Sequence, residues 1–476
     1  MVNPAPWILC DGAYLSTATT TDDQGRTVFP SDRPTLINEL SIEWGRDDQW
    51  TQPDPTVLTF TMWEPAPGVW LGKVVNQTAI RRGVLVGYDR GGNDAGARYI
   101  FQGFTTNVDV RAARRRTAAG MTDGFLVQVQ AGDRSAFLGQ INWYAGVLPQ
   151  ENMQERAVRL RNQAAPVGIR QFYFEDRFKA GQVKAVDVKS KSVLDTLNEL
   201  YKSFADQWAY NPNRNVINRI PTGSQWGTYS LTFGVSTGDN RIRIYPPNWT
   251  DPTGKEDPID TKPYPGGYIG AADVAGDISL SSNMIQDITD IACTWFNAPG
   301  NPPGDFTTNV NVKNQTPPAR LVFDSWFIDG IYVDPVIEDV RKMVSGDGAR
   351  PTHPQIVWDT TKTGDIPDWP TFESMTLPAQ TIRMVVLAGS PFSAATNYAP
   401  VWHPCGGIVR YVAGKWHITM NLSPTSMPLA ANHTPVTSAT INQSITLGNP
   451  NTWHIDKSIT PFDLYYVGAG GVYAQN

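Results

Sequence analysis

Apolar and polar residues alternate with a period of two along several stretches of the chain, and this alternation predicts half-buried β-strands. The clearest examples are residues 57–63, VLTFTMW, and residues 414–424, GKWHITMNLSP. The side chains predicted to face the core are Leu58, Phe60 and Met62 in the first stretch and Trp416, Ile418, Met420 and Leu422 in the second. Further strands are predicted within residues 83–92 and 382–390.

A basic segment, RAARRRTAAGMTD, separates two more predicted strands, over residues 97–110 and 124–133. This order predicts a long β-hairpin with an arginine-rich tip. The arginines are Arg111, Arg114, Arg115 and Arg116. Such a tip can be a solvated turn, a contact for phosphates, or a partner for an acidic surface on a neighbouring protein ring. Because the chain as a whole is acidic, we favour protein contact over nucleic acid.

Helical spacing of apolar residues occurs in three stretches, over residues 154–164, 192–210 and 334–348. The second is the strongest prediction, because its apolar residues form one stripe and Ser192 suits the N-cap. For the third, Asp334 suits the N-cap and a proline follows it in the first turn. Helices are therefore expected to be few.

Stretches rich in Pro, Gly, Asn and Thr predict linkers or large loops over residues 211–227, 245–268 and 297–319. The order of elements predicts a mainly β chain with an α/β insert between two β-rich regions. The expected domains are a β-domain over 1–147, a mixed α/β insert over 148–275, a second β-rich domain over 276–424 with a helix near 334–346, and a C-terminal extension over 425–476.

The composition agrees with this prediction. Charged residues make up 18% of the 476 residues, and Gly (41), Pro (37) and Trp (16) are frequent, which favours β-strands and loops over helices. The net charge of −6 argues against a general nucleic-acid binder. The sequence shows no export signal and no apolar run of about 20 residues that could cross a membrane.

The cysteines Cys10, Cys293 and Cys405 are too few and too scattered for a disulfide framework or a zinc site, which predicts reduced, structural thiols and fits assembly in a cytoplasm. Cys405 has His403 and His417 nearby in sequence, as a nucleophilic pair would require. However, His417 lies on the polar face of a predicted strand, and no helix begins near the thiol. A buried cysteine and surface histidines are the preferred interpretation.

No motif predicts a metal, a nucleotide or a catalytic centre. The five histidines lack ligand spacing, and residues 89–96, DRGGNDAG, favour a hairpin turn over a calcium loop. Paired carboxylates for glycoside hydrolysis could be proposed for Glu43 with Asp47 or Asp48, and for Asp287 with Asp290. Any chain with 45 acidic residues offers such pairs. We therefore expect no enzyme activity and no cofactor.

The segment SIEWGRDDQW, residues 41–50, combines tryptophans with a charged cluster before the strand at 57–63. It could be a site or a sugar platform. The strand that follows favours a connecting loop, stiffened by Pro53 and Pro55. Arg46 would then form a salt bridge to a nearby acid. The tryptophans Trp44, Trp50 and Trp63 would cap the end of a β-barrel.

The order of these motifs resembles that of minor tail proteins, or tail-tip hubs, of long-tailed phages of actinobacteria. The resemblance covers residues 35–165 and, less closely, 400–424. It includes the WGR motif with its acidic residues and Gln-Pro-x-Pro step, the F-x-G strand at 101–103, and the arginine-bearing helix after LPQENMQERAVRL. It also includes an A-x-D-x-x-A-x-L step formed by Ala131, Asp133, Ala136 and Leu138. These are structural positions and include no catalytic residue.

The resemblance implies a hub of two tail-tube-like β-barrel domains flanking a mixed middle region, assembled as a homotrimer. Duplicated domains in a trimer match the six-fold symmetry of a tail tube. The implied partners are the distal tail or tube ring, the tape measure, and a tail fibre or needle. DNA would pass only in transit, and the host envelope would be contacted indirectly.

We therefore expect a structural virion protein at the tail tip, used in host attachment and genome passage, with the arginine hairpin contacting the adjacent ring. The alternative is a carbohydrate-binding or cell-wall glycan-degrading tail protein. It would require a cleft with paired acids and flat, exposed tryptophans.

Overall fold

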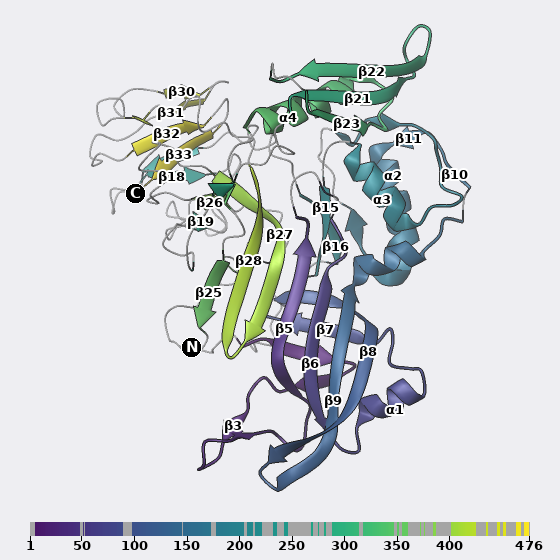
Figure 1. Ribbon diagram of the computed structural model, residues 1–476. Coiled ribbons are helices and arrows are strands. Elements are labelled where there is room, and N and C mark those ends of the chain that lie inside the picture. The colour runs from purple at the N-terminus through teal and green to yellow at the C-terminus, as the bar shows by residue number, and fades with distance from the viewer. Residues whose placement is uncertain are drawn as a thin grey trace.

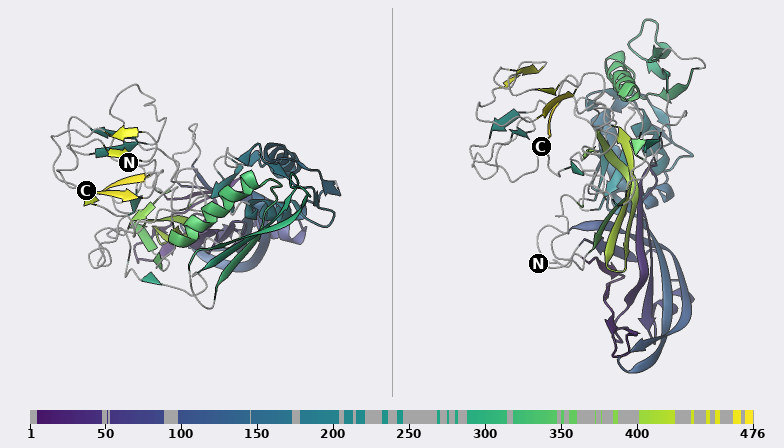
Figure 2. Two further views of the ribbon diagram at one scale, coloured as in Figure 1. Left: turned by 90° about the horizontal axis from the view of Figure 1, so that it is seen from above. Right: turned by 60° about the vertical axis from the view of Figure 1, so that its left-hand side comes forward.

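The computed structural model describes residues 5–47, 53–88, 98–144, 146–172, 178–203, 207–212, 215–220, 288–313, 318–346 and 401–424, with Thr51 and short pieces within 232–281, 350–386 and 435–475. A large β-sheet forms one end of the described molecule, and a unit of helices and short strands forms the other (Figures 1 and 2). The chain is mainly β, as predicted.

The large sheet has 12 strands and takes them from distant parts of the chain. The main path is β19-β26-β27-β5-β6-β9-β8-β7-β1-β2, and β28 pairs with β27 and β25. In chain order these strands are β1 (Trp7–Cys10), β2 (Ala13–Leu15), β5 (Thr35–Gly45), β6 (Val57–Pro65), β7 (Gly83–Gly87), β8 (Tyr99–Thr117), β9 (Gly120–Asp133), β19 (Tyr268–Ile269), β25 (Gln355–Asp359), β26 (Met384–Val386), β27 (Val401–Val412) and β28 (Lys415–Pro424).

The register of β6 explains its alternating sequence. Phe60 lies opposite Leu40 of β5 and opposite Val129 of β9, and all three side chains are buried. Thr59 and Thr61, which point to the other face, are half-buried. In β28 the four apolar side chains predicted to face the core are also buried. Both strand predictions are confirmed.

A first hydrophobic core covers this sheet and combines residues 8–131 with residues 356–422. Val409 of β27 lies opposite Ile42 of β5, so the N-terminal and C-terminal strands share one hydrogen-bonded ladder. The helix α1 (Val69–Val75) adds the buried ring of Trp70 to this core. A small hairpin of β3 (Thr20–Thr21) and β4 (Thr27–Val28) lies beside the sheet.

A second core lies in the mixed unit and joins residues 138–210 to residues 288–344. Its helices are η1 (Arg134–Gln140), α2 (Met153–Ala164), η2 (Ala165–Val167), α3 (Val193–Lys202) and α4 (Gly330–Gly346). Its strands are β10 (Val147–Leu148), β11 (Glu151–Asn152), β12 (Gln171–Phe172), β13 (Gln182–Val183), β14 (Val186–Asp187), β15 (Gln207–Asn211), β16 (Val216–Ile220), β21 (Asp290–Asn297), β22 (Gly304–Asn311) and β23 (Arg320–Asp324).

The predicted domains follow the chain in order, whereas each core draws on two distant segments. Residues 288–344 and residues 401–424 were expected in one β-rich domain. In the structure the first segment packs with residues 138–210, and the second pairs with β5. The physical reason is that an unpaired strand edge and an exposed apolar face are each satisfied by whichever element covers them, and that element need not be a sequence neighbour.

The helix predictions are confirmed in type and corrected in extent. The helix predicted over 154–164 is α2, with a capping box between Asn152 and Glu155. Ser192 caps α3 as predicted, but this helix ends at Lys202. Trp208 belongs to β15 and donates its indole N–H to Asn198 Oδ1 at 2.7 Å. The apolar stripe continued past the helix because both elements pack on the same core.

The third helix, α4, begins at Gly330, four residues before the predicted N-cap. Asp329 Oδ1 accepts a hydrogen bond from the backbone N–H of Ile331, so Asp329 has the role that was predicted for Asp334. Pro335 consequently lies inside the helix. The proposed N-cap was wrong because a Pro tolerated early in a helix imitates the usual start signal.

The predicted linkers have different outcomes. Residues 304–311 form β22, which pairs along its whole length with β21, so the loop predicted over 297–319 was wrong there. Residues 216–220 form β16, which interrupts the loop predicted over 211–227. The loop over 245–268 and the predicted turn over 89–96 lie outside the described residues, apart from the ends of β18 (Ile242–Tyr245) and β19.

The remaining short strands lie in the described pieces near the C-terminus and in the middle of the chain. They are β17 (Thr232–Val235), β20 (Leu280–Ser281), β24 (Arg350–Pro351), β29 (Pro435–Val436), β30 (Ile445–Leu447), β31 (Asn451–Trp453), β32 (Asp463–Val467) and β33 (Gly471–Gln475). No described helix is long and apolar enough to cross a membrane.

Candidate interaction surface on the arginine hairpin

The strands β8 and β9 form one long hairpin, with a register shift between Thr105 and Asn107, that extends to the lower end of the molecule in Figure 1. Pairing runs from Gly103 opposite Asp133 to Thr117 opposite Gly120. The predicted hairpin is therefore confirmed. Its arginines occupy paired strand positions just before the turn, and the turn itself holds small residues.

Because neighbouring residues of a strand point to opposite faces, Arg111 and Arg115 lie on one face of the hairpin. Arg114 and Arg116 lie on the other face. The four arginines thus form two pairs on opposite faces instead of a single patch. The basic run in the sequence did not reveal this division, because it depends on where the turn begins.

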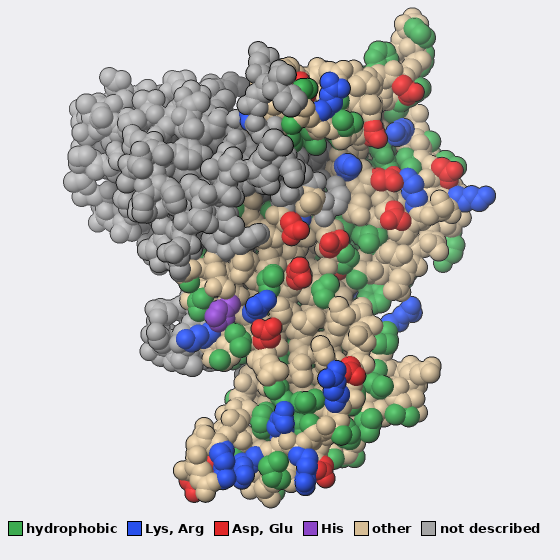
Figure 3. Space-filling model, in the orientation of Figure 1, with side chains coloured by type: hydrophobic (Ala, Val, Ile, Leu, Met, Phe, Trp, Pro, Cys, Tyr) green, Lys and Arg blue, Asp and Glu red, His purple; other side chains and the backbone are tan. Residues whose placement is uncertain are grey.

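Carboxylates of the same chain accompany three of these arginines. Arg111 Nε lies 2.8 Å from Asp109 Oδ2, and Arg114 Nε lies 2.6 Å from Asp123 Oδ1. Both pairs are well exposed, so each contributes only about 0–1 kcal/mol to folding and remains available for exchange with another acid. Figure 3 shows this mixture of basic and acidic side chains at the lower end of the molecule.

Arg116 connects the hairpin to the β3–β4 loop. Its Nε lies 3.9 Å from Asp22 Oδ2, and its backbone oxygen accepts a hydrogen bond from Phe29 N at 2.8 Å. Asp22 also pairs with Arg26, and hydrogen bonds from Arg26 hold the pKa of Asp22 below its usual value. Arg115 differs, since it forms no ion pair with any described carboxylate and its Nη1 donates to the carbonyl oxygen of Arg114.

At the base of the same hairpin, Asp133 connects the sheet to the mixed unit. Its carboxylate accepts hydrogen bonds from the backbone N–H groups of Ser135 and Ala136, which caps η1, and from Thr56 N at 3.0 Å. Burial raises the pKa of Asp133, while these hydrogen bonds oppose that effect. The A-x-D-x-x-A-x-L step is thus a structural joint.

The charged loop after β5 contacts the strands β27 and β28, which lie more than 350 residues later in the sequence. Arg46 is buried (3% exposed) and donates its backbone N–H to the carbonyl oxygen of Cys405 at 3.2 Å. Trp44 and Trp63 are also buried, so neither offers an open ring face to a sugar. These contacts support an architectural loop. Trp50 and Asp48 lie outside the described residues, and the predicted salt bridge of Arg46 stays a prediction.

Cys405 and His417 do not form a nucleophilic pair, because His417 lies opposite Arg410, further along β27 from Cys405. The side chain of His403 lies outside the described part of the chain. Cys405 is buried, and its Sγ lies 3.3 Å from the carbonyl oxygen of Asn421. Burial, then Lys415 and Arg410, lowers the pKa of His417. Burial also raises the pKa of Cys10 and of Cys293 to about 12. These two thiols are therefore protonated and unreactive at neutral pH.

The structure describes one of the three proposed carboxylate pairs in full. Glu43 and Asp47 of this pair are both exposed, on β5 and in the loop after it, and Asn421 Nδ2 lies 3.5 Å from Asp47 Oδ1. Asp290 begins β21 and accepts a hydrogen bond from Asn311. Asp287 lies outside the described residues. Within the part of the chain that the structure describes, no group of three or more His, Cys, Asp or Glu residues could hold a metal ion.

No protein-family model and no curated protein sequence matches this chain. Among solved structures, a tail protein from Neisseria meningitidis MC58 aligns with a TM-score of 0.48 and 10% identity, covering 90% of this chain and 98% of that one. The 43 kDa tail protein of prophage MuSo2 from Shewanella oneidensis aligns with a TM-score of 0.43 and 9% identity, covering 88% and 98%.

A component of the E. coli type VI secretion system, which exhibits structural similarity to T4 bacteriophage tail proteins, aligns with a TM-score of 0.38 and 7% identity. That alignment covers 93% of this chain and 96% of the other. The alignments therefore extend over most of each chain. Because every TM-score lies below 0.5, the roles of these proteins do not transfer to this chain.

Proposed function

We propose that this chain is a structural phage tail protein, a tail-tip hub that joins the tail tube or distal tail ring to a fibre or needle. The observation that carries the proposal is the hairpin β8–β9, which extends its paired strands to one end of the molecule and bears arginines on both faces there. A rigid, two-faced charged arm suits insertion between subunits of a neighbouring ring.

The motifs behind the resemblance to tail-tip hubs support the same proposal. In the A-x-D-x-x-A-x-L step, Asp133 caps η1 where the sheet ends. In the WGR motif, the backbone N–H of Arg46 donates to the carbonyl oxygen of Cys405 and so joins two strands of the sheet. Both motifs therefore lie at positions that determine how the sheet is built. In this proposal the hub is a homotrimer in the virion, with other tail proteins as partners. It attaches the tail to the host and lets DNA pass in transit.

The decisive experiment replaces Arg111, Arg114, Arg115 and Arg116 with Ser in the phage that encodes the chain. We expect an intact fold and a loss of assembled, infectious tails of about tenfold or more, because the charged arm no longer matches its partner. The matched control replaces four exposed basic residues elsewhere with Ser, namely Lys189, Lys202, Arg320 and Arg410. Normal tail assembly by the hairpin variant would contradict the proposal.

Oligomeric state gives a second test. Particle images or a mass measurement of the chain with its ring partner should show three copies around a channel. A stable complex with one copy would contradict the trimer. The alternative, a glycan-binding or glycan-degrading tail protein, would be favoured if the purified chain bound or degraded cell-wall glycan.

A further inference from the structure

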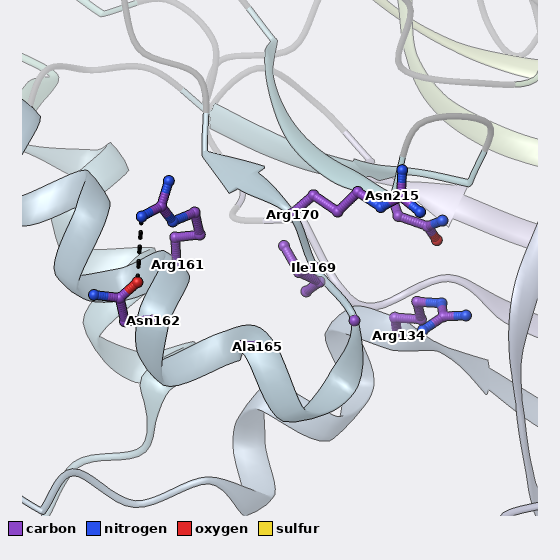
Figure 4. A pocket seen from close by; sticks show the side chains of 8 residues that line it. Arg134, Arg161, Asn162, Ala165, Ile169, Arg170 and Asn215 are labelled. Atoms are coloured by element: carbon purple, nitrogen blue, oxygen red, sulfur yellow. Dashed lines mark hydrogen bonds between the residues drawn. The ribbon is translucent and has the colours of Figure 1, made fainter.

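An arginine-lined pocket lies in the mixed unit, next to its junction with the large sheet (Figure 4). The cavity has a volume of about 440 Å³. Side chains from η1, α2 and the segments before β12 and β16 line it, among them Arg134, Arg161, Asn162, Ile169, Arg170 and Asn215. Among the described residues that line the pocket none is acidic, and its wall presents three guanidinium groups and two amides. We refer to it below as the arginine pocket.

Several contacts hold Arg134 in place. Its Nη1 donates to the carbonyl oxygen of Val167 at 2.9 Å, and its Cζ lies 5.5 Å from the ring centre of Phe104. Gly168, with φ +82°, leaves room for the guanidinium, because a Cβ at this position would lie 2.1 Å from Nη1. The charge at this wall is therefore preorganised before any ligand arrives.

The opposite wall is also held by the backbone. Arg170 N donates to the carbonyl oxygen of Asn215 at 2.7 Å, and Asn215 N donates to that of Asn211 at 2.9 Å. The hydroxyl of Tyr210 donates to Asn215 Oδ1 at 2.6 Å. This bond orients the amide of Asn215 and leaves its Nδ2 to donate toward a ligand.

Arg161 and Arg170, like Arg134, form no ion pair with a carboxylate among the described residues. Two other arginines of α2 do have a carboxylate partner. Arg156 Nε lies 2.5 Å from Glu151 Oε1, and Arg159 Nη2 lies 2.8 Å from Glu151 Oε2. Glu151 therefore neutralises the charge of two arginines on α2, whereas the three arginines at the pocket have no carboxylate partner among the described residues. Arg161 Nη2 lies 3.4 Å from Asn162 Oδ1 within the pocket (Figure 4), which is a neutral acceptor. Guanidinium groups at a concave surface that have no carboxylate partner favour an oxyanion ligand.

We propose that the arginine pocket binds carboxylate side chains of an acidic peptide segment of a partner protein. The amides of Asn162 and Asn215 can bond to the backbone of such a segment. Nucleic acid fits less well, because the described residues of the pocket lining include no aromatic ring for base stacking. The inference rests on the pocket and does not depend on the tail-tip role.

The test is binding of a capped tetraglutamate peptide to the full chain, measured by calorimetry at low and at physiological salt. We expect Arg161→Gln with Arg170→Gln to weaken binding by about tenfold or more, because two charge-assisted bonds are lost. Arg170→Lys should weaken binding by an intermediate factor, because lysine keeps the positive charge but cannot form the bidentate hydrogen bonds of a guanidinium group. Arg134 is left unchanged because its contacts also support the fold.

The matched control is Lys202→Gln with Arg320→Gln, which removes the same charge at exposed positions away from the pocket. Equal weakening by both double variants would overturn the proposal, because the binding would then follow net charge. Absence of binding by the folded chain would overturn it as well. Tighter binding of a single-stranded oligonucleotide that depends on Arg161 and Arg170 would assign the pocket to nucleic acid instead.

Discussion

The side-chain amide of Asn421 donates a hydrogen bond to the backbone oxygen of Arg46 at 3.0 Å, across a sequence separation of 375 residues. The backbone N–H of Arg46 in turn donates to Cys405, so one residue joins β27 and β28 to the end of β5. This bond adds to the ladder that joins β5 to β27 in the large sheet.

Replacing Asn421 with Ala should therefore destabilise the fold by about 1 kcal/mol, the usual net value of a partly buried hydrogen bond. Denaturant unfolding measures the change in the free energy of unfolding. Asn309→Ala, at an exposed position of β22, is the control and should change stability by less than about 0.5 kcal/mol. Equal effects of the two variants would show that the Asn421 bond does not stabilise the fold.

Gly45 approaches the opposite strand so closely that no side chain fits. It has φ +74°, and a Cβ added here would lie 2.2 Å from the carbonyl oxygen of Cys405. Gly45→Ala should cost about 2 kcal/mol or more, because the strain of a positive φ adds to a backbone clash. Gly12→Ala has the same kind of φ with open space around it and should cost only about 1 kcal/mol. Thermal unfolding of both variants separates the cost of the backbone clash from the cost of the positive φ.

The buried ion pair of Glu151 and Arg156 should be far more sensitive than an exposed one. The side chain of Arg156 is fully buried, and Glu151 is 6% exposed. Glu151→Ala leaves a buried cation without its partner, which should cost about 3 kcal/mol. Glu338→Ala breaks an exposed pair with Arg341 and should cost less than about 1 kcal/mol. Similar losses in the two variants would contradict this contrast.

The thiols should react only after unfolding. Burial raises the pKa of Cys10 and Cys293 to about 12, and the thiolate is the reactive form. Alkylation by iodoacetamide at pH 8 should therefore be very slow in the native chain and fast in denaturant. In the native state the rate should rise only as the pH approaches 12, whereas the unfolded thiols titrate near their ordinary pKa. Rapid native labelling of either cysteine at pH 8 would contradict the prediction.

Local sequence patterns predicted the type of each helix and strand better than the residues at which it begins and ends. Leu58, Phe60 and Met62 alternate because one face of β6 is buried, and this effect acts within a few residues. The helix predicted over 192–210 ended early because Trp208 fills the same core from a strand, which periodicity alone does not distinguish from a longer helix.

The candidate surfaces needed more than local pattern. The basic run at 111–116 was visible in the sequence, but the register of β8 with β9 decided that its arginines divide between two faces. The arginine pocket had no sequence signal, since Arg134, Arg161 and Arg170 follow no common motif. They meet because η1, α2 and β12 pack around the second core.

The sequence by itself determined that the chain is mainly β, that a basic hairpin exists, and that Ser192 begins a helix. Each of these depends on the spacing of neighbouring side chains. Only the tertiary structure decided that β5 pairs with β27, that each core joins distant segments, and that three arginines line one pocket. Those relationships depend on which apolar faces and strand edges fit together in space, and the spacing of neighbouring side chains does not specify that fit.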